Sequence, residues 1–421
     1  MTSTPFTIHN LPYGIVSTEE NPRPYQAIAY KNYAIDVGIL ETHGVFDDIP
    51  GFKAGVLNKS TWNAFAALPS HTRLTFRQRL TSYLESTTPD LRNHTIFTPL
   101  TQCTTHLPMH PQNYSDFYCS HEHAANCSAI FGFDIAQGWY HLPQVYNGRT
   151  SSLAVSGTPI TRPCGVFPVN KGDAPTFQAE GKLDFEMEMG VWICGGVPRG
   201  QRLDINKAKE CIFGFTLLND WSARQIQFFE MAPLGPFHSK GSLTSVSAWI
   251  VPVEALEGVA ACARHYEQEP APLGHLKWRG DGDRATWDVH VEARLVRGGK
   301  EYVVSRSNLN ELHWTPLQMV THLASAGEGL SAGDVFGTGT ISSSRTNERG
   351  EKIGLSCLWE RQLEDARMES LPGDLHETLL KDGDEVVMSA WCEDGNGEVV
   401  FGFGECRGVV LPAVELQGHE K

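Results

Sequence analysis

Three carboxylates alternate with hydrophobic residues in the segment LDFEMEMGVWI, which covers positions 183–193. Asp184, Glu186 and Glu188 lie two positions apart, so on a β-strand they share one face at a spacing of roughly 7 Å. Like charges at that spacing repel one another unless water or a cation absorbs the field. The apolar flank GVWICGG argues against full exposure of this face. The segment therefore predicts a site for a hard divalent cation, and a solvated strand face is the alternative.

A second polar group follows the strand-like run FGFTLLND. We expect Asp220 to cap a helix on which Arg224 and Gln227 lie one turn apart. An arginine and a glutamine on one helix face could donate hydrogen bonds to an oxyanion, and a local Asp–Arg ion pair is the alternative. Further along, the loop PLGPFHSKGSLT brings Lys240 and Thr244 back towards this region. Lys240 could there neutralise a developing negative charge, although a lysine in such a loop is usually solvated.

A third cluster, DFYCSHEH, places an acid, a phenol and two histidines within the eight residues from Asp116 to His123. A histidine that titrates near neutral pH is the usual general base in enzymes. The chain has 17 histidines, so this cluster alone does not identify a base.

The length of the chain predicts two domains, because 421 residues exceed the size at which single cores usually stop growing. The region 101–115 is rich in proline and polar residues, and we place the boundary near Leu107. The expected domains are residues 1–107 and 108–421. One helix is expected from about Arg73 to Glu85, and another after the capping-box sequence that starts at Thr315. The larger domain otherwise reads as short strands, with a hairpin loop at 394–397.

Composition excludes several functions. The formal charge of -15 and the absence of a basic run argue against nucleic acid as a partner. The N-terminal sequence lacks the features of a secretory signal, and no window approaches the roughly 20 apolar residues of a membrane span. Ten cysteines without a C-x-x-C pair read as free thiols in a reducing compartment. We expect a cytoplasmic protein, and no nucleotide-binding glycine motif is present.

Taken in order, these segments resemble the fumarylacetoacetate hydrolase family, and within it the long two-domain eukaryotic type. The matching text includes DFYCSHEH, YHLPQVYNGR, SSLAVSGTPITRP, LDFEMEM, FGFTLLNDWSARQIQ, PLGPFHSKG, GTGTIS and FGFGECRGVVLPA. The resemblance implies a mainly β (α+β) fold, with a small SH3-like N-terminal barrel and a larger β-roll that forms a homodimer.

The resemblance also implies a role for each matching residue. The metal ligands fall on Asp116, Glu186, Glu188 and Asp220, with Lys240 and Thr244 close behind. The general base falls on His123 and the oxyanion donors on Arg224, Gln227 and Lys240, while substrate contacts fall on Tyr118, Tyr146 and Thr340. All-oxygen ligands suit Mg²⁺ or Ca²⁺ equally well.

The sequence departs from the family pattern where the substrate binds. Gly132 stands where the family places an arginine, and Met231 stands in place of a second tyrosine. Losing both groups removes charge-assisted recognition of an acid, an interaction worth about 1.5–3 kcal/mol. We therefore expect a more apolar or bulkier substrate than fumarylacetoacetate.

A further departure concerns the glutamate that orients the base in this family. Ser356 stands in its place, three residues before Trp359, which would leave His123 without its usual partner unless Glu348 or Glu351 compensates.

These observations predict a metal-dependent enzyme acting on a 1,3-dicarbonyl or another enolisable small molecule. The cation would chelate two oxygens and stabilise an enolate, and carbon–carbon bond hydrolysis is the expected reaction. Decarboxylation, tautomerisation or carbon–carbon bond formation is the first alternative, because the orienting glutamate is missing. A catalytically silent scaffold that binds a metabolite is the second.

Overall fold

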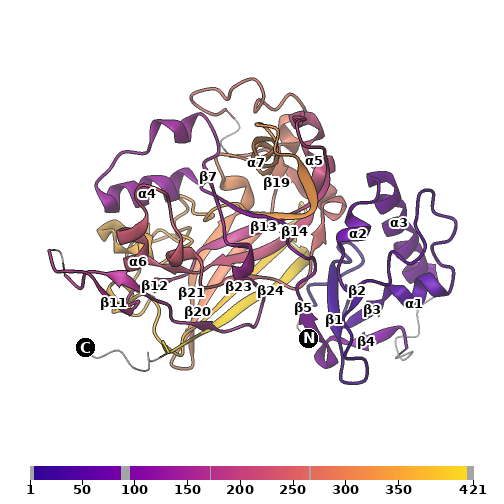
Figure 1. Ribbon diagram of the computed structural model, residues 1–421, viewed down its shortest axis with the longest axis horizontal. Helices are drawn as coiled ribbons and strands as arrows, with labels where there is room; N and C mark the ends of the chain where they lie inside the picture. Colours follow the sequence, from indigo (N-terminus) through magenta and orange to yellow (C-terminus); the bar gives the residue numbers. More distant parts are fainter. Residues whose placement is uncertain (1–3, 87–94, 171, 265–266, 415–421) are drawn as a thin grey trace.

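The computed structural model describes residues 4–86, 95–170, 172–264 and 267–414. A smaller N-terminal part packs beside a larger part that is rich in strands (Figure 1). Strands dominate and helices are short, so the expected mainly β (α+β) class is confirmed. The exact boundary at Leu107 stays a prediction.

The N-terminal part is built on a five-stranded antiparallel sheet in the order β4-β3-β2-β1-β5. Its strands are β1 (Tyr13–Ser17), β2 (Tyr25–Tyr30), β3 (Tyr33–Asp36), β4 (Phe97–Pro99) and β5 (Thr104–His106). Its helices are α1 (Val37–Thr42), α2 (Asn63–Ala66) and α3 (Ser70–Ser86). Helix α3 confirms the expected helix. Leu80 and Leu84 are buried as the apolar spacing requires, whereas Leu74 is 43% exposed.

The core of the N-terminal part continues into the larger part. Tyr13 stacks on Trp62 with ring centroids 4.7 Å apart, and on Phe213 of the larger part at 5.3 Å. Trp192 and Val335 of the larger part belong to the same buried cluster. The two parts therefore share one continuous apolar core, which fixes the back of the larger sheet.

The larger part contains an eight-stranded sheet in the order β7-β6-β22-β13-β14-β16-β8, with β17 also paired to β14. These strands are β6 (Tyr114–Phe117), β7 (Val145–Asn147), β8 (Leu153–Val155), β13 (Met187–Val197), β14 (Ile212–Asp220), β16 (Thr244–Val246), β17 (Val251–Pro252) and β22 (Leu330–Gly337). Every residue of β14 is buried, and so are all but one of β13. Burial on both faces explains why these central strands read as nearly continuous apolar runs.

A second sheet of five strands has the order β21-β20-β23-β24-β9. Its strands are β9 (Ile160–Thr161), β20 (His290–Arg297), β21 (Lys300–Asn308), β23 (Glu385–Glu393) and β24 (Val399–Leu411). The predicted hairpin loop at 394–397 connects β23 to β24. There Asp394 Oδ1 accepts hydrogen bonds from the backbone N–H groups of Asn396 and Glu398. The largest apolar cluster of the molecule includes side chains from both sheets of this part.

Short helices flank these sheets, and two of them, α4 and α6, carry residues of the candidate site. They are α4 (His121–Phe131), α5 (Ala208–Cys211), α6 (Arg224–Glu230), α7 (Pro316–Leu323) and α8 (Leu375–Thr378). Helix α7 has the predicted capping box, formed by Thr315 and Gln318. In α4, the Ser120 side chain accepts the backbone N–H of His123, which fixes the first turn.

Candidate active site

The predicted residues converge on one cleft of about 480 Å³ in the larger part. Those that line it are Asp116, Tyr118, His123, Tyr146, Glu186, Arg224, Gln227, Met231, Lys240 and Thr340. Glu188, Asp220 and Thr244 are buried and do not line the cleft. Residues from six separate stretches of the chain thus meet at one place.

Three acids meet at the bottom of the site. Asp116 on β6, Glu188 on β13 and Asp220 at the end of β14 each offer a carboxylate oxygen, and these three atoms lie within 4.8 Å of one another. Gly337 on β22 keeps the space between them open. A Cβ atom at this position would lie 2.4 Å from Glu188 Oε2 and 2.7 Å from Asp116 Oδ1. The glycine is therefore needed for the acids to approach one another.

The electrostatics of this carboxylate centre fit a divalent cation. Asp116 Oδ1 and Asp220 Oδ1 are buried and accept no hydrogen bond from any residue that the structure describes. Burial raises the pKa of Glu188 well above its usual value, and the charges of Asp116 and Asp220 raise it further. A doubly charged ion would both give the unpartnered oxygens a ligand and offset the repulsion among the carboxylates. Oxygen-only ligands suit Mg²⁺ and Ca²⁺.

Tyr146 contacts two of these acids. Its hydroxyl lies 2.8 Å from Asp116 Oδ2 and 3.1 Å from Asp220 Oδ2. Burial and the neighbouring Asp116 raise the pKa of Tyr146. The phenol therefore stays protonated and can donate a hydrogen bond. Tyr146 was predicted to contact the substrate. It lines the cleft, but its hydroxyl donates to the carboxylate centre.

Glu186 lies between the carboxylate centre and a group of cations. Its Oε1 is 2.8 Å from Nη1 of Arg224, and its Oε2 pairs with Nζ of Lys240. Lys240 Nζ also lies 2.5 Å from Asp220 Oδ2. Burial alone would raise the pKa of Glu186, but Lys240 and Arg224 lower it below its usual value. Glu186 was expected as a metal ligand, and here it is the partner of two cations beside that centre.

Thr244 stands next to this centre rather than in it. It pairs with Asp220 across β16 and β14, and its hydroxyl lies 3.0 Å from Ser152 Oγ.

Asp184, the first acid of the alternating segment, has a role that the sequence did not assign. Its Oδ2 accepts hydrogen bonds from Nε and Nη2 of Arg224 at 2.9 and 2.7 Å. Its carboxylate also accepts the backbone N–H groups of Leu358 and Trp359. Asp184 therefore points away from the carboxylate centre and fixes the guanidinium of Arg224 towards the cleft. The alternating pattern singled out Asp184, but its role could not be predicted because its partners are distant in sequence.

The predicted cap of helix α6 was wrong. Asp220 ends β14, its side chain is drawn into the carboxylate centre, and the N-cap position falls on Ala223. Glu180 Oε2 instead accepts the backbone N–H groups of Gln225 and Ile226 in the first turn. Arg224 and Gln227 do share a helix face, since Arg224 Nη1 donates to Gln227 Oε1 at 3.0 Å.

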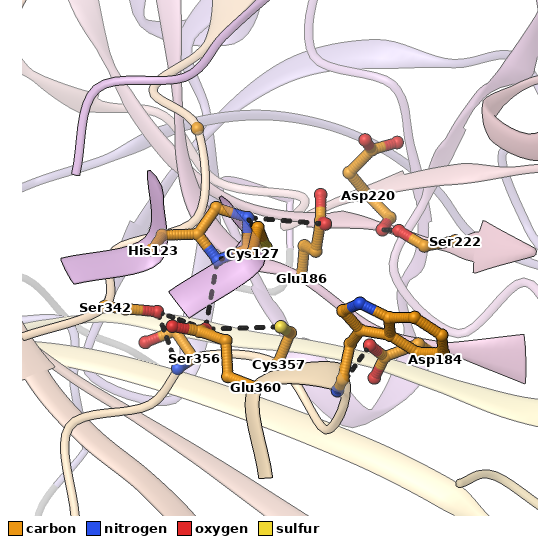
Figure 2. Close-up of polar contacts among 12 residues, drawn as sticks. His123, Cys127, Asp184, Glu186, Asp220, Ser222, Ser342, Ser356, Cys357 and Glu360 are labelled. Carbon is orange, nitrogen blue, oxygen red and sulfur yellow. Dashed lines mark hydrogen bonds and ion pairs between the residues drawn. The ribbon is translucent and has the colours of Figure 1, made fainter. Parts of the chain in front are cut away.

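His123 has a buried carboxylate partner, which the sequence did not predict. Its Nδ1 lies 3.0 Å from Oε2 of Glu360, and its Nε2 lies 3.8 Å from Oε1 of Glu186 (Figure 2). Glu360 is held by Ser342 Oγ at 2.6 Å and by Asn126 Nδ2 at 2.8 Å. Burial lowers the pKa of His123, but the neighbouring Cys127 and Glu360 raise it well above the usual value. The imidazole is therefore oriented by Glu360, and it is a strong base once it has lost its proton.

The expectation that His123 lacks an orienting partner was therefore wrong. Ser356 takes no part, because its hydroxyl donates to the carbonyl of Ile341 at 2.7 Å. Glu351 does not compensate either, since its side chain accepts from Asn347 Nδ2 and from the backbone N–H of Glu369.

Glu348 is exposed and is not the partner of His123. The orienting carboxylate comes from the position after Trp359 rather than from three positions before it. The only signal for this in the sequence was the presence of Glu360 beside that tryptophan.

The outer wall of the cleft is apolar. Phe131, Phe133, Ile135, Met231 and Trp359 line it. Gly132 itself is not among the lining residues. It adopts a left-handed conformation with φ 74° that ends helix α4, a role for which glycine is favoured. Gly132, which was predicted to bind substrate, thus does not line the cleft itself, but its neighbours Phe131 and Phe133 do.

Comparison with known proteins identifies the class. The family model described as fumarylacetoacetate hydrolase C-terminal matches residues 112–411, and the one described as fumarylacetoacetase N-terminal matches residues 9–108. The chain belongs to the fumarylacetoacetate hydrolase family.

Individual relatives match along nearly the whole chain. It is 37% identical to fumarylacetoacetase of Bos taurus over 98% of this chain and 97% of the relative, and 36% identical to that of Homo sapiens over 97% of each. The solved fumarylacetoacetate hydrolase from psychrophilic Exiguobacterium antarcticum has a similar fold, with a TM-score of 0.51 at 17% identity over 95% of this chain and 99% of that one. The two fumarylacetoacetases and the family match support a hydrolase that acts on carbon–carbon bonds and depends on a divalent metal. None of the helices in the described residues is long and apolar enough to cross a membrane.

Proposed function

We propose that this protein hydrolyses a carbon–carbon bond of a 1,3-dicarbonyl compound whose side chain is more apolar than that of fumarylacetoacetate. The observation that carries the proposal is the contact between His123 Nδ1 and Glu360 Oε2, in a cleft that also leads to three clustered acids. A histidine oriented by a buried carboxylate is the arrangement that activates water or a hydroxyl group in many hydrolases.

The proton transfers fall to His123. When the imidazole is neutral and its Nδ1 donates to Glu360, Nε2 is free to accept a proton from water. After the water attacks the carbonyl carbon, the imidazolium can return this proton to the carbon that leaves. Glu360 keeps the ring in one orientation and stabilises its positive charge throughout.

Charge that develops on the attacked carbonyl oxygen would be met by fixed donors. Arg224 is held by Asp184 and Lys240 by Glu186 and Asp220, so neither donor must reorganise during the reaction. A divalent cation held by Asp116, Glu188 and Asp220 would supply Lewis-acid polarisation of substrate oxygens.

The apolar wall supports the proposed change of substrate. Met231 stands where the resemblance places a tyrosine, and Phe131, Phe133 and Trp359 stand along the same wall. Phe131 stacks on Phe228 with centroids 5.8 Å apart and lies 6.1 Å from the Trp359 ring. Such a surface offers no partner to a substrate carboxylate but suits an alkyl or aryl group.

A panel of 1,3-diketones and acylpyruvates, with fumarylacetoacetate as reference, tests the proposal in the presence of Mg²⁺ and then of a chelator. We expect metal-dependent cleavage, with higher kcat/KM for alkyl or aryl substrates. Turnover of fumarylacetoacetate at an ordinary enzymatic rate, above all others, would refute the change of substrate. Decarboxylation or isomerisation without cleavage would favour the non-hydrolytic alternative.

We also propose that the protein acts as a homodimer in the cytoplasm. Near the cleft, Phe228 is 67% exposed and Leu234 96% exposed, an apolar surface that a second copy could cover. All ten cysteines are free, which suits a reducing compartment. Sedimentation equilibrium should give twice the chain mass of 46.5 kDa, and a monomer mass would contradict the dimer.

A further inference from the structure

A second group of potential metal ligands lies on the other side of His123, away from the carboxylate centre. Oε2 of Glu360 is 3.0 Å from His123 Nδ1 and 3.2 Å from Cys357 Sγ. One ligand atom from each of the three side chains lies within 4.8 Å of the others, and all three residues are buried. In Figure 2, the side chains of Cys357 and Glu360 lie below the imidazole ring of His123.

The spacing of these atoms suits a tetrahedral ion. Bond lengths of about 2.0–2.1 Å to nitrogen and oxygen and about 2.3 Å to sulfur put neighbouring ligands of tetrahedral Zn²⁺ about 3.3–3.6 Å apart. The two distances measured from Glu360 Oε2 are each within a few tenths of an ångström of that range. Lengthening these two distances by a few tenths of an ångström would bring both pairs to the tetrahedral spacing.

The ligand types separate this group from the carboxylate centre. Asp116, Glu188 and Asp220 offer only oxygen, which Mg²⁺ and Ca²⁺ prefer. A thiolate and an imidazole prefer softer ions such as Zn²⁺, and coordination by Cys357 would release its thiol proton to solvent. The two sites should therefore bind different cations from a mixture.

We propose that His123, Cys357 and Glu360 form a second cation site that binds Zn²⁺ or a similar thiophilic divalent ion and thereby inhibits the enzyme. An ion bound to His123 Nδ1 replaces the hydrogen bond with Glu360 and removes the imidazole from proton transfer. The inhibitory effect rests on the proposed function, whereas the binding itself does not.

Cys127 provides a matched control for Cys357. Its Sγ also contacts the catalytic imidazole, but at 3.8 Å from Nδ1 and 3.7 Å from Nε2. A sulfur nearly equidistant from both ring nitrogens faces the ring rather than one nitrogen lone pair. Cys127 is accordingly outside the group of three ligands, although both thiols are buried next to His123.

Cobalt spectroscopy tests binding without any substrate. The folded protein is saturated with Mg²⁺ and titrated with Co²⁺, and the thiolate-to-cobalt charge-transfer band is recorded. We expect the band in the wild type and in Cys127→Ser, and its loss in both Cys357→Ser and Cys357→Ala. Circular dichroism and the Tm establish that each variant is folded. The absence of a band in the wild type, or its persistence in the folded Cys357 variants, would overturn the proposal.

Inhibition is measured separately, in excess Mg²⁺, as the ratio of rates with and without Zn²⁺ for each variant. We expect Cys357→Ser to need at least about 10-fold more Zn²⁺ for half inhibition than the wild type or Cys127→Ser, with recovery on chelation. Equal sensitivity of all three proteins would place the inhibitory ion in the carboxylate centre. If no hydrolysis is found, the proposed function fails while the cobalt spectrum still decides whether the site exists.

Discussion

Glu360 and His123 form a buried pair, with Oε2 of the carboxylate 3.0 Å from Nδ1 of the imidazole. The pair joins a residue that follows Trp359 to the first turn of helix α4, and neither segment predicts the other. Glu360 thus provides the orienting carboxylate that would otherwise be lost where Ser356 replaces the glutamate of the family.

Glu360→Gln tests this pair. The amide retains the shape but cannot stabilise the imidazolium, so we expect kcat to fall by about 10²- to 10⁴-fold with a smaller change in KM. The matched control is Glu351→Gln, which changes the nearby glutamate whose partners are Asn347 and the backbone of Glu369. Both variants are measured by steady-state kinetics. Similar decreases in kcat in the two variants would contradict a positioning role for Glu360.

A divalent cation should stabilise the folded protein through the carboxylate centre. Binding at 100 times its Kd adds about 2.7 kcal/mol to the free energy of unfolding, so Mg²⁺ or Ca²⁺ should raise the Tm and a chelator should lower it. Glu188→Gln should abolish most of that difference, because it removes one of the three charges that hold the ion. A Tm that responds equally to cation in the wild type and in Glu188→Gln would place the ion elsewhere.

The metal-free protein should lose stability as the pH rises. The pKa of Glu188 is raised above its usual value of 4.5, so above that pH the folded state holds a proton that the unfolded state has lost. The free energy of unfolding then falls with increasing pH, from about 4.5 up to the raised value.

Urea unfolding in chelator at several pH values measures this effect. Because other groups also titrate, the informative quantity is the difference between Glu188→Gln and the wild type. The variant should gain relative stability as the pH rises. A difference that is constant or decreases with pH would contradict the repulsion among the acids.

Met231→Tyr tests the origin of substrate preference. A phenol at this position restores a hydrogen-bond donor, and a bond to a charged group is worth about 1.5–3 kcal/mol, or roughly 10- to 100-fold. We expect kcat/KM for fumarylacetoacetate to rise relative to an alkyl diketone, while Met231→Leu leaves the ratio unchanged. An unchanged ratio in the tyrosine variant would show that Met231 does not set specificity.

Much of the fold and the site could be predicted from residue patterns. The alternation of Asp184, Glu186 and Glu188 marked the segment that delivers Glu186 and Glu188 to the site. The strand is interrupted between β12 (Leu183–Asp184) and β13, however, and Asp184 turns to Arg224 instead. The capping box at Thr315 marked helix α7. Local signals of this kind are reliable because strand pleating and helix capping depend on neighbours in sequence.

The remaining features depend on contacts between distant segments. Asp220 has the sequence position of a helix cap, but its carboxylate lies with Asp116 and Glu188, and Glu180 caps the helix instead. The partner of His123 likewise could not be found by position, because a carboxylate on a different residue reaches the same point in space. Only the folded chain shows which acid faces the base.

The most direct measurement follows the oxygen of water into the product. The protein is incubated with Mg²⁺ and an alkyl 1,3-diketone in ¹⁸O-labelled water, and the products are analysed by mass spectrometry. If His123 and Glu360 activate water for carbon–carbon cleavage, each turnover places one labelled oxygen in the new carboxylate, and Glu360→Gln slows this incorporation. Turnover that yields an isomerised or condensed product without labelled carboxylate would contradict hydrolysis.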